Sequence, residues 1–311
     1  MSRCLIVTKV AQQFAAEIER LAGSAIPVTV CTDADQARSA YTDEKVLFGN
    51  PQQIAEILPD MPTIEWVQSS WAGVTPLIES SRRDYVLTGV KGVFGPQMSE
   101  YVLGYLLAHE LRVTERQKQQ QSHRWFRDHS GVLFGKSIGI MGTGSIGTHI
   151  AGTARAFNMR TLGLSRSGAP AENFDDVWAV TDLREFLSRS HYLVATLPAT
   201  PETDKLLDAD TLSALPEGAY FINVGRSNVV DDSALLDALE RNHLSGAALD
   251  VFDEEPLPDN SPLWDAPNLS VTAHVAAISH PLLIVPIFVE NYRRFMAGEP
   301  LQYAIDFEAG Y

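Results

Sequence analysis

An arginine, a glutamate and a histidine of this sequence follow successive apolar runs that are typical of buried strands. The three side chains are Arg226, Glu255 and His274, and the apolar runs before them cover residues 220–224, 246–251 and 269–273. The carboxyl ends of parallel strands lie at one edge of a sheet, and ligands bind beyond that edge. We therefore expect the three side chains to converge there.

These three residue types suit the reduction of a 2-oxo acid. A guanidinium can hold the acid's carboxylate and polarise its keto oxygen, and an imidazolium can donate a proton as hydride reaches the carbonyl carbon. A nearby carboxylate favours the charged imidazole and fixes its tautomer. Each residue alone also has a structural interpretation: His274 as a satisfied strand-end histidine, Arg226 as a partner of a local carbonyl, and residues 253–255 as a solvated acidic loop.

A glycine-rich turn lies between a strand pattern and a helical pattern. It has the spacing Gly142-x-Gly144-x-x-Gly147, with Ser145 and Ile146 in the variable positions. In a dinucleotide fingerprint the first glycine permits the tight turn, the second admits the pyrophosphate and the third brings helix and strand close together. The alternative is a glycine-rich turn without a ligand.

Two series of strand patterns predict an α/β protein with two doubly wound parallel-sheet domains. Apolar runs alternating with helical patterns predict a small flavodoxin-like domain before about residue 90, and its strand patterns cover residues 4–10, 28–32, 45–49, 64–68 and 85–90. Six further strand patterns predict a Rossmann domain of order 3-2-1-4-5-6; they cover residues 137–141, 160–165, 192–197, 220–224, 246–251 and 269–273. The helical pattern near the C-terminus should return to the first domain. The expected domains are residues 1–96 with 277–311, and residues 97–276 inserted between them.

Two other segments have a predicted role. The Pro96–Gln121 pattern predicts one long helix with a broad apolar face, suited to burial between domains or against a second subunit. After a strand, the small residues around Trp71, Ala72, Gly73 and Val74 can turn backbone N–H groups outward and form a nest for a carboxylate. A tight turn with one packed tryptophan is the equally open alternative.

Composition excludes several classes of function. The 311 residues are 45% hydrophobic and 20% charged, which is ordinary for a globular protein, and the net charge of -15 disfavours nucleic acid and anionic membranes as partners. Cys4 and Cys31 lie in apolar runs without metal-ligand spacing, so we expect buried thiols, no metal site and a reducing compartment, the cytoplasm. No apolar run has the length of a signal sequence or of a membrane span.

Five motifs in order make the chain resemble the D-isomer-specific 2-hydroxyacid dehydrogenase family over nearly its whole length. They are the glycine turn and residues 197–203, 221–226, 248–256 and 271–274. The resemblance implies that Arg226 binds substrate, Glu255 pairs with the histidine and His274 is the acid/base. It also implies substrate contacts from Trp71, Ala72, Gly73 and Val74. Further cofactor contacts are implied for Leu197, Pro198, Thr203, Val224, Gly225 and Asp250, the last near the nicotinamide carboxamide.

Two departures from the family pattern stand out. Ala273 takes the place of a proline that often precedes the histidine, which implies a looser backbone. At the end of the second Rossmann strand, Ser165, Arg166 and Ser167 replace the acid that NAD-specific members use for the ribose, and they can bind a 2'-phosphate instead. We therefore expect NADP to be preferred, with NAD possible.

The subgroup that the chain most resembles is glyoxylate/hydroxypyruvate reductase, acting on a small 2-oxo or 2-hydroxy acid. The resemblance of Pro96–Gln121 to the family's dimerisation element implies a homodimer. Two alternatives stay open at the level of sequence. One is a dinucleotide-sensing, corepressor-like binding protein built on the same fold, and the other is a dehydrogenase of a different small donor, such as formate or phosphite.

Overall fold

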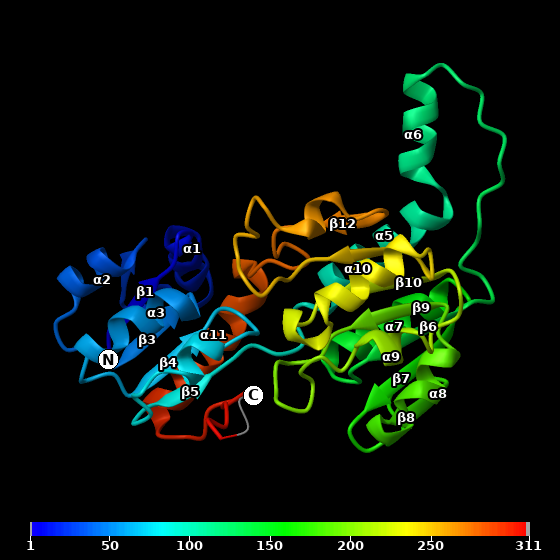
Figure 1. The fold of residues 1–311 in the computed structure, drawn as a ribbon. Helices are drawn as coiled ribbons and strands as arrows, with labels where there is room; N and C mark the ends of the chain where they lie inside the picture. Colours follow the sequence, from blue (N-terminus) through cyan, green and yellow to red (C-terminus); the bar gives the residue numbers. More distant parts are fainter. Residues whose placement is uncertain (1, 309–311) are drawn as a thin grey trace. The chain divides into compact units, whose positions relative to one another are not determined.

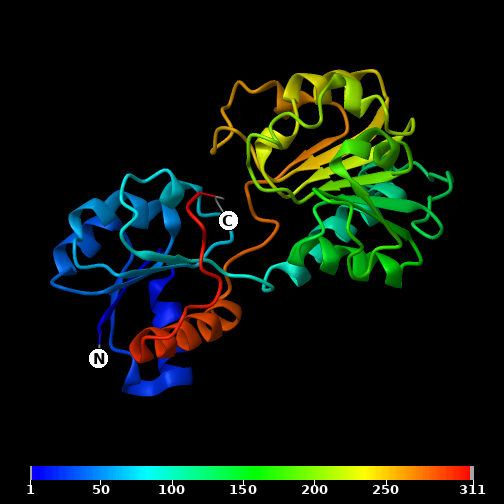
Figure 2. The same ribbon diagram turned by 90° about the horizontal axis from the view of Figure 1, so that it is seen from below.

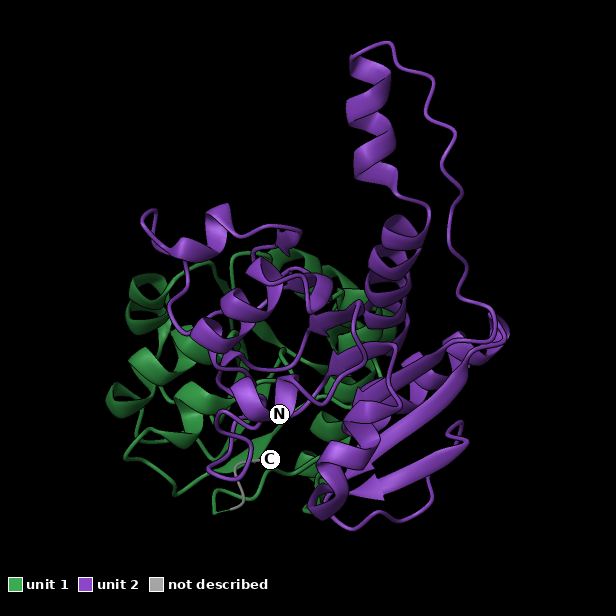
Figure 3. Ribbon diagram, turned by 45° about the vertical axis from the view of Figure 1, so that its right-hand side comes forward, with its two compact units in different colours: residues 1–93, 279–311 green, residues 94–278 purple. Residues whose placement is uncertain are grey.

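The computed structural model describes residues 2–308, which form two compact units (Figure 3). Unit 1 comprises the chain up to Val93 and again from Ser279, and unit 2 is Phe94–Ile278. The chain thus crosses between the units at 93/94 and at 278/279, close to the crossings expected near residues 96 and 277. Within the described residues, no helix is long and apolar enough to cross a membrane.

Unit 1 is built on a parallel sheet with the strand order 2-1-3-4-5, the flavodoxin-like order that the sequence predicts (Figure 1). Its strands are β1 (Cys4–Val7), β2 (Val28–Cys31), β3 (Val46–Gly49), β4 (Trp66–Ser69) and β5 (Val86–Thr88). Its helices are α1 (Ala11–Ala22), α2 (Ala34–Ala40), α3 (Pro51–Ile57), α4 (Thr75–Ile78) and α11 (Pro281–Ala297). Strands β1, β3 and β4 are buried along their whole length, as expected of continuous apolar runs covered on both faces.

Helix α11 brings the end of the chain back to the sheet of unit 1, as the sequence predicts. It begins after His280, whose side chain accepts the N–H of Leu282, and ends at Gly298 in the left-handed conformation. The Phe288 ring stacks on Phe48 of β3 with centroids 4.5 Å apart. Asn291, fully buried, donates to Gln68 Oε1 of β4 at 3.1 Å, so the helix is fixed by polar as well as apolar contacts.

Unit 2 is built on a seven-stranded parallel sheet, one strand more than predicted (Figure 2). Its strands are β6 (Ser137–Met141), β7 (Arg160–Ser165), β8 (Asp176–Ala179), β9 (Tyr192–Ala195), β10 (Ala219–Asn223), β11 (Leu244–Leu249) and β12 (Leu269–Val271). The spatial order β8-β7-β6-β9-β10-β11-β12 is the Rossmann order 3-2-1-4-5-6 with one strand added at the end. The prediction missed β8, so 192–197 holds the fourth strand and not the third. β8 is a half-buried edge strand, and its short apolar run, residues 177–180, directly follows Asp175 and Asp176.

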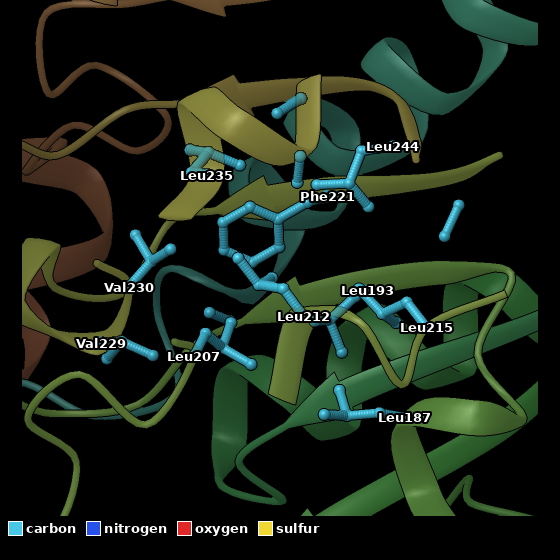
Figure 4. Close-up of a cluster of buried hydrophobic side chains, with 14 of the residues drawn as sticks. Leu187, Leu193, Leu207, Leu212, Leu215, Phe221, Val229, Val230, Leu235 and Leu244 are labelled. Carbon is cyan, nitrogen blue, oxygen red and sulfur yellow. The ribbon is translucent and has the colours of Figure 1, made fainter. Parts of the chain in front are cut away.

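Two layers of helices cover this sheet. They are α5 (Gly95–Glu110), α7 (Ser145–Ala156), α8 (Leu183–Ser188), α9 (Ala209–Leu212) and α10 (Asp232–Glu240). Helices α5 and α7 share one apolar core with the sheet, which includes Val102, Ile140 and Ile150. Helices α8, α9 and α10 share the core on the other face, where Leu187, Leu212 and Leu235 belong to the same buried cluster as Phe221 of β10 (Figure 4).

The prediction of a single long helix over Pro96–Gln121 is wrong. The structure has α5 and a separate helix α6 (Val113–Gln121), divided at Arg112, which adopts the left-handed conformation with φ 53°. That conformation interrupts the i to i−4 hydrogen bonds of a continuous helix. The Arg112 guanidinium forms ion pairs with Glu115 at 2.5 Å and Asp128 at 3.1 Å. The long-range partner Asp128 is not visible in the local helical pattern.

Candidate active site

The glycine turn lies where β6 ends and α7 begins, as predicted. Gly142 has φ 107°, a conformation that favours glycine, and a Cβ on Gly147 would lie 2.0 Å from the carbonyl oxygen of Gly142. The backbone geometry alone therefore requires glycine at both positions. Gly144 has an ordinary φ of -75°, and a Cβ there would meet nothing within 4 Å. Its lack of a side chain leaves open space beside the first turn of α7.

This open space fits the pyrophosphate of a dinucleotide. Ser145 and Ile146 lie in the first turn of the 12-residue helix α7, where backbone N–H groups have no partner within the helix and the helix dipole is positive. Both features favour an anion. The residues present thus fit the cofactor that the glycine spacing predicts.

Ser165, Arg166 and Ser167 form the turn that follows β7, at the same edge of the sheet. The Ser165 hydroxyl accepts the N–H of Gly168 at 3.1 Å, which closes the turn, while Arg166 and Ser167 are exposed. The charge of Arg166 contributes to lowering the pKa of Glu202, although the largest cause is a hydrogen bond from the backbone of Glu202 itself. The turn therefore offers hydroxyls and a guanidinium to an anionic group.

The loops after β9 and β10 approach each other closely. Thr203 donates its hydroxyl to the carbonyl of Pro198 at 2.8 Å and so closes the loop after β9. A Cβ on Gly225 would lie 2.8 Å from the carbonyl oxygen of Leu197, so only glycine permits this approach. Val224 is buried beneath it.

Arg226 directly follows Gly225, the residue that approaches Leu197. The buried Asn223 accepts the N–H of Gly225 at 3.0 Å and donates to the carbonyl of Arg226 at 2.9 Å, so one side chain shapes the turn. The guanidinium donates to the Gly225 carbonyl at 2.7 Å. Burial lowers the pKa of Arg226, and the negative charge of Glu255 opposes this shift. A partly desolvated guanidinium is well suited to bind a carboxylate.

His274 and Glu255 are paired in the structure. His274 Nδ1 lies 2.9 Å from Glu255 Oε2, and Glu255 Oε1 accepts the N–H of Phe252 at 3.1 Å. The side chains are 37% and 38% exposed, so the pair is accessible to solvent. Because a carboxylate accepts hydrogen bonds, Nδ1 of His274 carries a proton in this pair.

Asp250 holds the segment that carries His274. It is 2% exposed, and its Oδ1 accepts from the Thr272 hydroxyl at 2.6 Å and the Val275 N–H at 2.8 Å. Its Oδ2 accepts the Ala276 N–H at 2.9 Å, and its own carbonyl accepts the His274 N–H at 2.9 Å. The contact with the nicotinamide carboxamide stays a prediction; what the structure gives Asp250 is a positioning role.

The expected substrate loop belongs to unit 1. The Ser69 hydroxyl accepts the Trp71 N–H at 3.0 Å and donates to the Trp71 carbonyl at 2.9 Å, which folds the chain sharply after β4. Trp71 is 41% exposed and Ala72 is exposed, whereas Val74 is buried. Binding of a carboxylate by residues 71–74 stays a prediction.

Sequence reasoning found the residues at the strand ends and missed those that hold them. Asn223 and Thr272 lie inside motifs that were identified, yet neither was assigned a role. The signal for Asn223 is polarity at the buried end of a strand, because a buried polar side chain needs hydrogen-bond partners. Thr272 is only partly buried and carries no such signal. Among the described residues no group of three or more His, Cys, Asp or Glu side chains could hold a metal ion, and both cysteines are free and buried.

The chain is similar in sequence to a known family and to curated relatives. The family described as D-isomer specific 2-hydroxyacid dehydrogenase, NAD binding domain, matches residues 103–276. Glyoxylate/hydroxypyruvate reductase A of Salmonella heidelberg is 32% identical over 219 residues, which are 70% of this chain and 70% of the relative.

Solved structures match nearly the whole chain. A D-isomer specific 2-hydroxyacid dehydrogenase family protein from Aeromonas salmonicida has a TM-score of 0.94 and 38% identity, covering 99% of this chain and 100% of that one. An NADPH-dependent glyoxylate/hydroxypyruvate reductase from Sinorhizobium meliloti, solved with NADP and sulfate, has a TM-score of 0.89 and 27% identity, with coverage of 99% and 100%. With its NAD-binding domain, two parallel-sheet units and paired histidine and glutamate, this chain belongs to the D-isomer-specific 2-hydroxyacid dehydrogenase family of NAD(P)-dependent oxidoreductases.

Proposed function

We propose that the protein uses NADPH to reduce a small 2-oxo acid of the glyoxylate/hydroxypyruvate class to a D-2-hydroxy acid. The observation that carries this proposal is the pair of His274 Nδ1 and Glu255 Oε2, 2.9 Å apart, at the same sheet edge as Arg226. The reductases named among the relatives support the substrate class.

Three residues have roles in the proposed reduction. Arg226 binds the substrate carboxylate and polarises the keto oxygen. His274, as an imidazolium, donates the proton on Nε2 to that oxygen, and Glu255 stabilises the positive charge and holds the ring. NADPH, when bound, supplies the hydride. In the oxidation direction neutral His274 accepts the proton.

The preference for NADPH rests on the turn after β7. An acid at this position would repel the 2'-phosphate, whereas Ser165 and Ser167 offer hydroxyls and Arg166 offers a guanidinium. The Sinorhizobium meliloti reductase carries NADP in its structure, and a further relative from Xanthobacter autotrophicus carries NADPH.

We also propose that the protein is a homodimer and resides in the cytoplasm. Residues 111–135 form an arm in which α6 extends away from the sheet of unit 2 (Figures 1 and 3). Large apolar side chains are exposed along the arm, among them Trp125 at 86%, Phe134 at 70% and Val132 at 61%. Exposure of this kind marks an interaction surface. Light scattering should give twice the chain mass, and Trp125→Glu should reduce it; a monomeric wild type contradicts the dimer.

The decisive experiment is a panel of 2-oxo acids assayed with NADPH and with NADH. We expect turnover of glyoxylate or hydroxypyruvate, faster with NADPH. His274→Ala should lower kcat by about 10²- to 10⁴-fold, the usual contribution of a general acid, whereas Gln52→Ala, at an exposed position of α3, should not. Cofactor binding without turnover of any acid would favour a dinucleotide-sensing protein instead.

A further inference from the structure

Two side chains of α5 hold the two ends of the segment that carries His274. At one end the carboxamide of Gln97 makes two hydrogen bonds with the backbone of Ile278: Nε2 donates to the carbonyl at 3.1 Å, and Oε1 accepts the N–H at 3.0 Å. At the other end the Tyr101 hydroxyl lies 2.7 Å from Thr272 Oγ1. Gln97 and Tyr101 are four residues apart, and therefore on one face of the helix.

The direction of the hydrogen bonds follows from the chemistry of the groups. The carboxylate of Asp250 only accepts, so the single hydroxyl proton of Thr272 points to it over 2.6 Å. Tyr101 must then be the donor to Thr272. Burial raises the pKa of Tyr101 well above its usual range, so the donor keeps its proton. The result is one chain of hydrogen bonds from α5 through Thr272 to Asp250, and from Asp250 to the N–H groups of Val275 and Ala276.

His274 itself needs to be held. Its φ is +54°, in the left-handed region that costs a non-glycine residue of the order of 1–2 kcal/mol. Such a conformation persists only where the surroundings fix it. Those surroundings are Asp250, which accepts the N–H groups of His274, Val275 and Ala276, and α5, which bonds the two ends of the segment.

We propose that Gln97 and Tyr101 are positioning residues for His274. They touch neither His274 nor the expected reacting atoms, and they act by fixing residues 272–278. Unit 2 begins at Phe94 and ends at Ile278. Gln97 lies three residues after Phe94 and bonds Ile278, so it links the first and the last residues of unit 2. This inference rests on the proposed function of His274 as proton donor.

The test uses Gln97→Met, which keeps the length of the side chain and removes both hydrogen bonds, Tyr101→Phe, which removes one hydroxyl, and their combination. Gln52→Met, at an exposed position of α3, is the control for the same replacement. The first measurement is hydrogen–deuterium exchange, which needs no turnover. In the double variant the N–H groups of Val275 and Ala276 should exchange about fivefold faster or more, because their acceptor Asp250 loses its support.

The second measurement is steady-state kinetics. We expect kcat of the double variant to fall about tenfold or more, because a small misplacement of the proton donor is costly. KM for NADPH should change much less than kcat, since most of the predicted cofactor contacts lie on the glycine turn and the turn after β7. The control should match the wild type in both measurements. If the double variant does not fold, Tyr101→Phe alone carries the test with the same signs.

The outcomes separate the inference from the proposed function. Unchanged exchange at Val275 and Ala276 overturns the inference, and so does faster exchange with an unchanged kcat. A wild type that turns over no 2-oxo acid overturns the proposed function, while faster exchange in the variants still supports the attachment of residues 272–278 to α5.

Discussion

Replacing Glu255 by Gln tests the pairing with His274 most directly. The change keeps the size of the side chain and an oxygen to accept the N–H of Phe252, which now lies 3.1 Å from Oε1. It removes the negative charge whose oxygen lies 2.9 Å from His274 Nδ1. The imidazolium that donates the proton in the reduction thereby loses its counter-charge.

The size of the effect follows from the geometry and the exposure of the pair. Two unit charges about 4 Å apart attract each other by about 1 kcal/mol in water and by about 4 kcal/mol at an effective dielectric constant of about 20. The side chains are 37% and 38% exposed, so solvent screens the pair and the lower value applies. In the oxidation direction His274 gains this positive charge as it accepts the proton, so a loss of about 1 kcal/mol slows that step about fivefold.

The assay is kcat/KM for oxidation of the D-2-hydroxy acid, followed by the absorbance of the NADPH formed. In Glu255→Gln this kcat/KM should fall about fivefold. Glu240→Gln, which makes the same change in net charge at the end of α10, should leave it unchanged. A kcat/KM that is unchanged in Glu255→Gln, or that rises, would refute the role of Glu255 in stabilising the charged ring.

Three further predictions concern the cofactor site and stability. Gly144→Ala should keep the melting temperature but weaken NADPH binding about tenfold or more in a titration. Gly147→Ala should lower the free energy of unfolding in urea by about 1–3 kcal/mol, because its Cβ would lie 2.0 Å from a carbonyl oxygen. Arg166→Ala should lower the ratio of kcat/KM for NADPH to that for NADH, and an unchanged ratio would exclude a contact with the 2'-phosphate. Burial lowers the pKa of His109, so the unfolded state binds more protons and stability should fall as the pH drops below about 6.5. Urea unfolding at about pH 7.5 and about pH 5.5 should show a smaller loss in His109→Phe, and an equal loss would contradict this source of acid sensitivity.

The parts of the fold that sequence could predict are those fixed by burial along the chain. Strands β6 and β7 were predicted with the bounds that the structure has, because both faces of a central parallel strand are covered and its residues form an apolar run. Strand β8 was missed because its apolar run, residues 177–180, is short and directly follows Asp175 and Asp176. The break at Arg112 was missed because its partner Asp128 lies 16 residues away in the sequence.

The same distinction holds for the candidate site. Arg226, Glu255 and His274 could be placed at one sheet edge because strand ends are visible in the sequence, and the structure brings Glu255 and His274 into contact. The hydrogen bonds of Asp250 to the N–H groups of Val275 and Ala276 depend on the path of a loop. A sequence pattern carries no information on that path, and the positioning role of Asp250 became visible only in the structure.

The discontinuity of unit 1 has a consequence for the order in which the protein forms on the ribosome. Strands β3 and β4 emerge early, but Phe288 and Asn291, which cover and bond them, are synthesised only after all of unit 2. The nascent chain therefore carries an N-terminal sheet that lacks its covering helix α11, while the contiguous nucleotide-binding unit is already able to fold. We expect unit 2 to become resistant to protease first during translation, and unit 1 only when α11 leaves the exit tunnel.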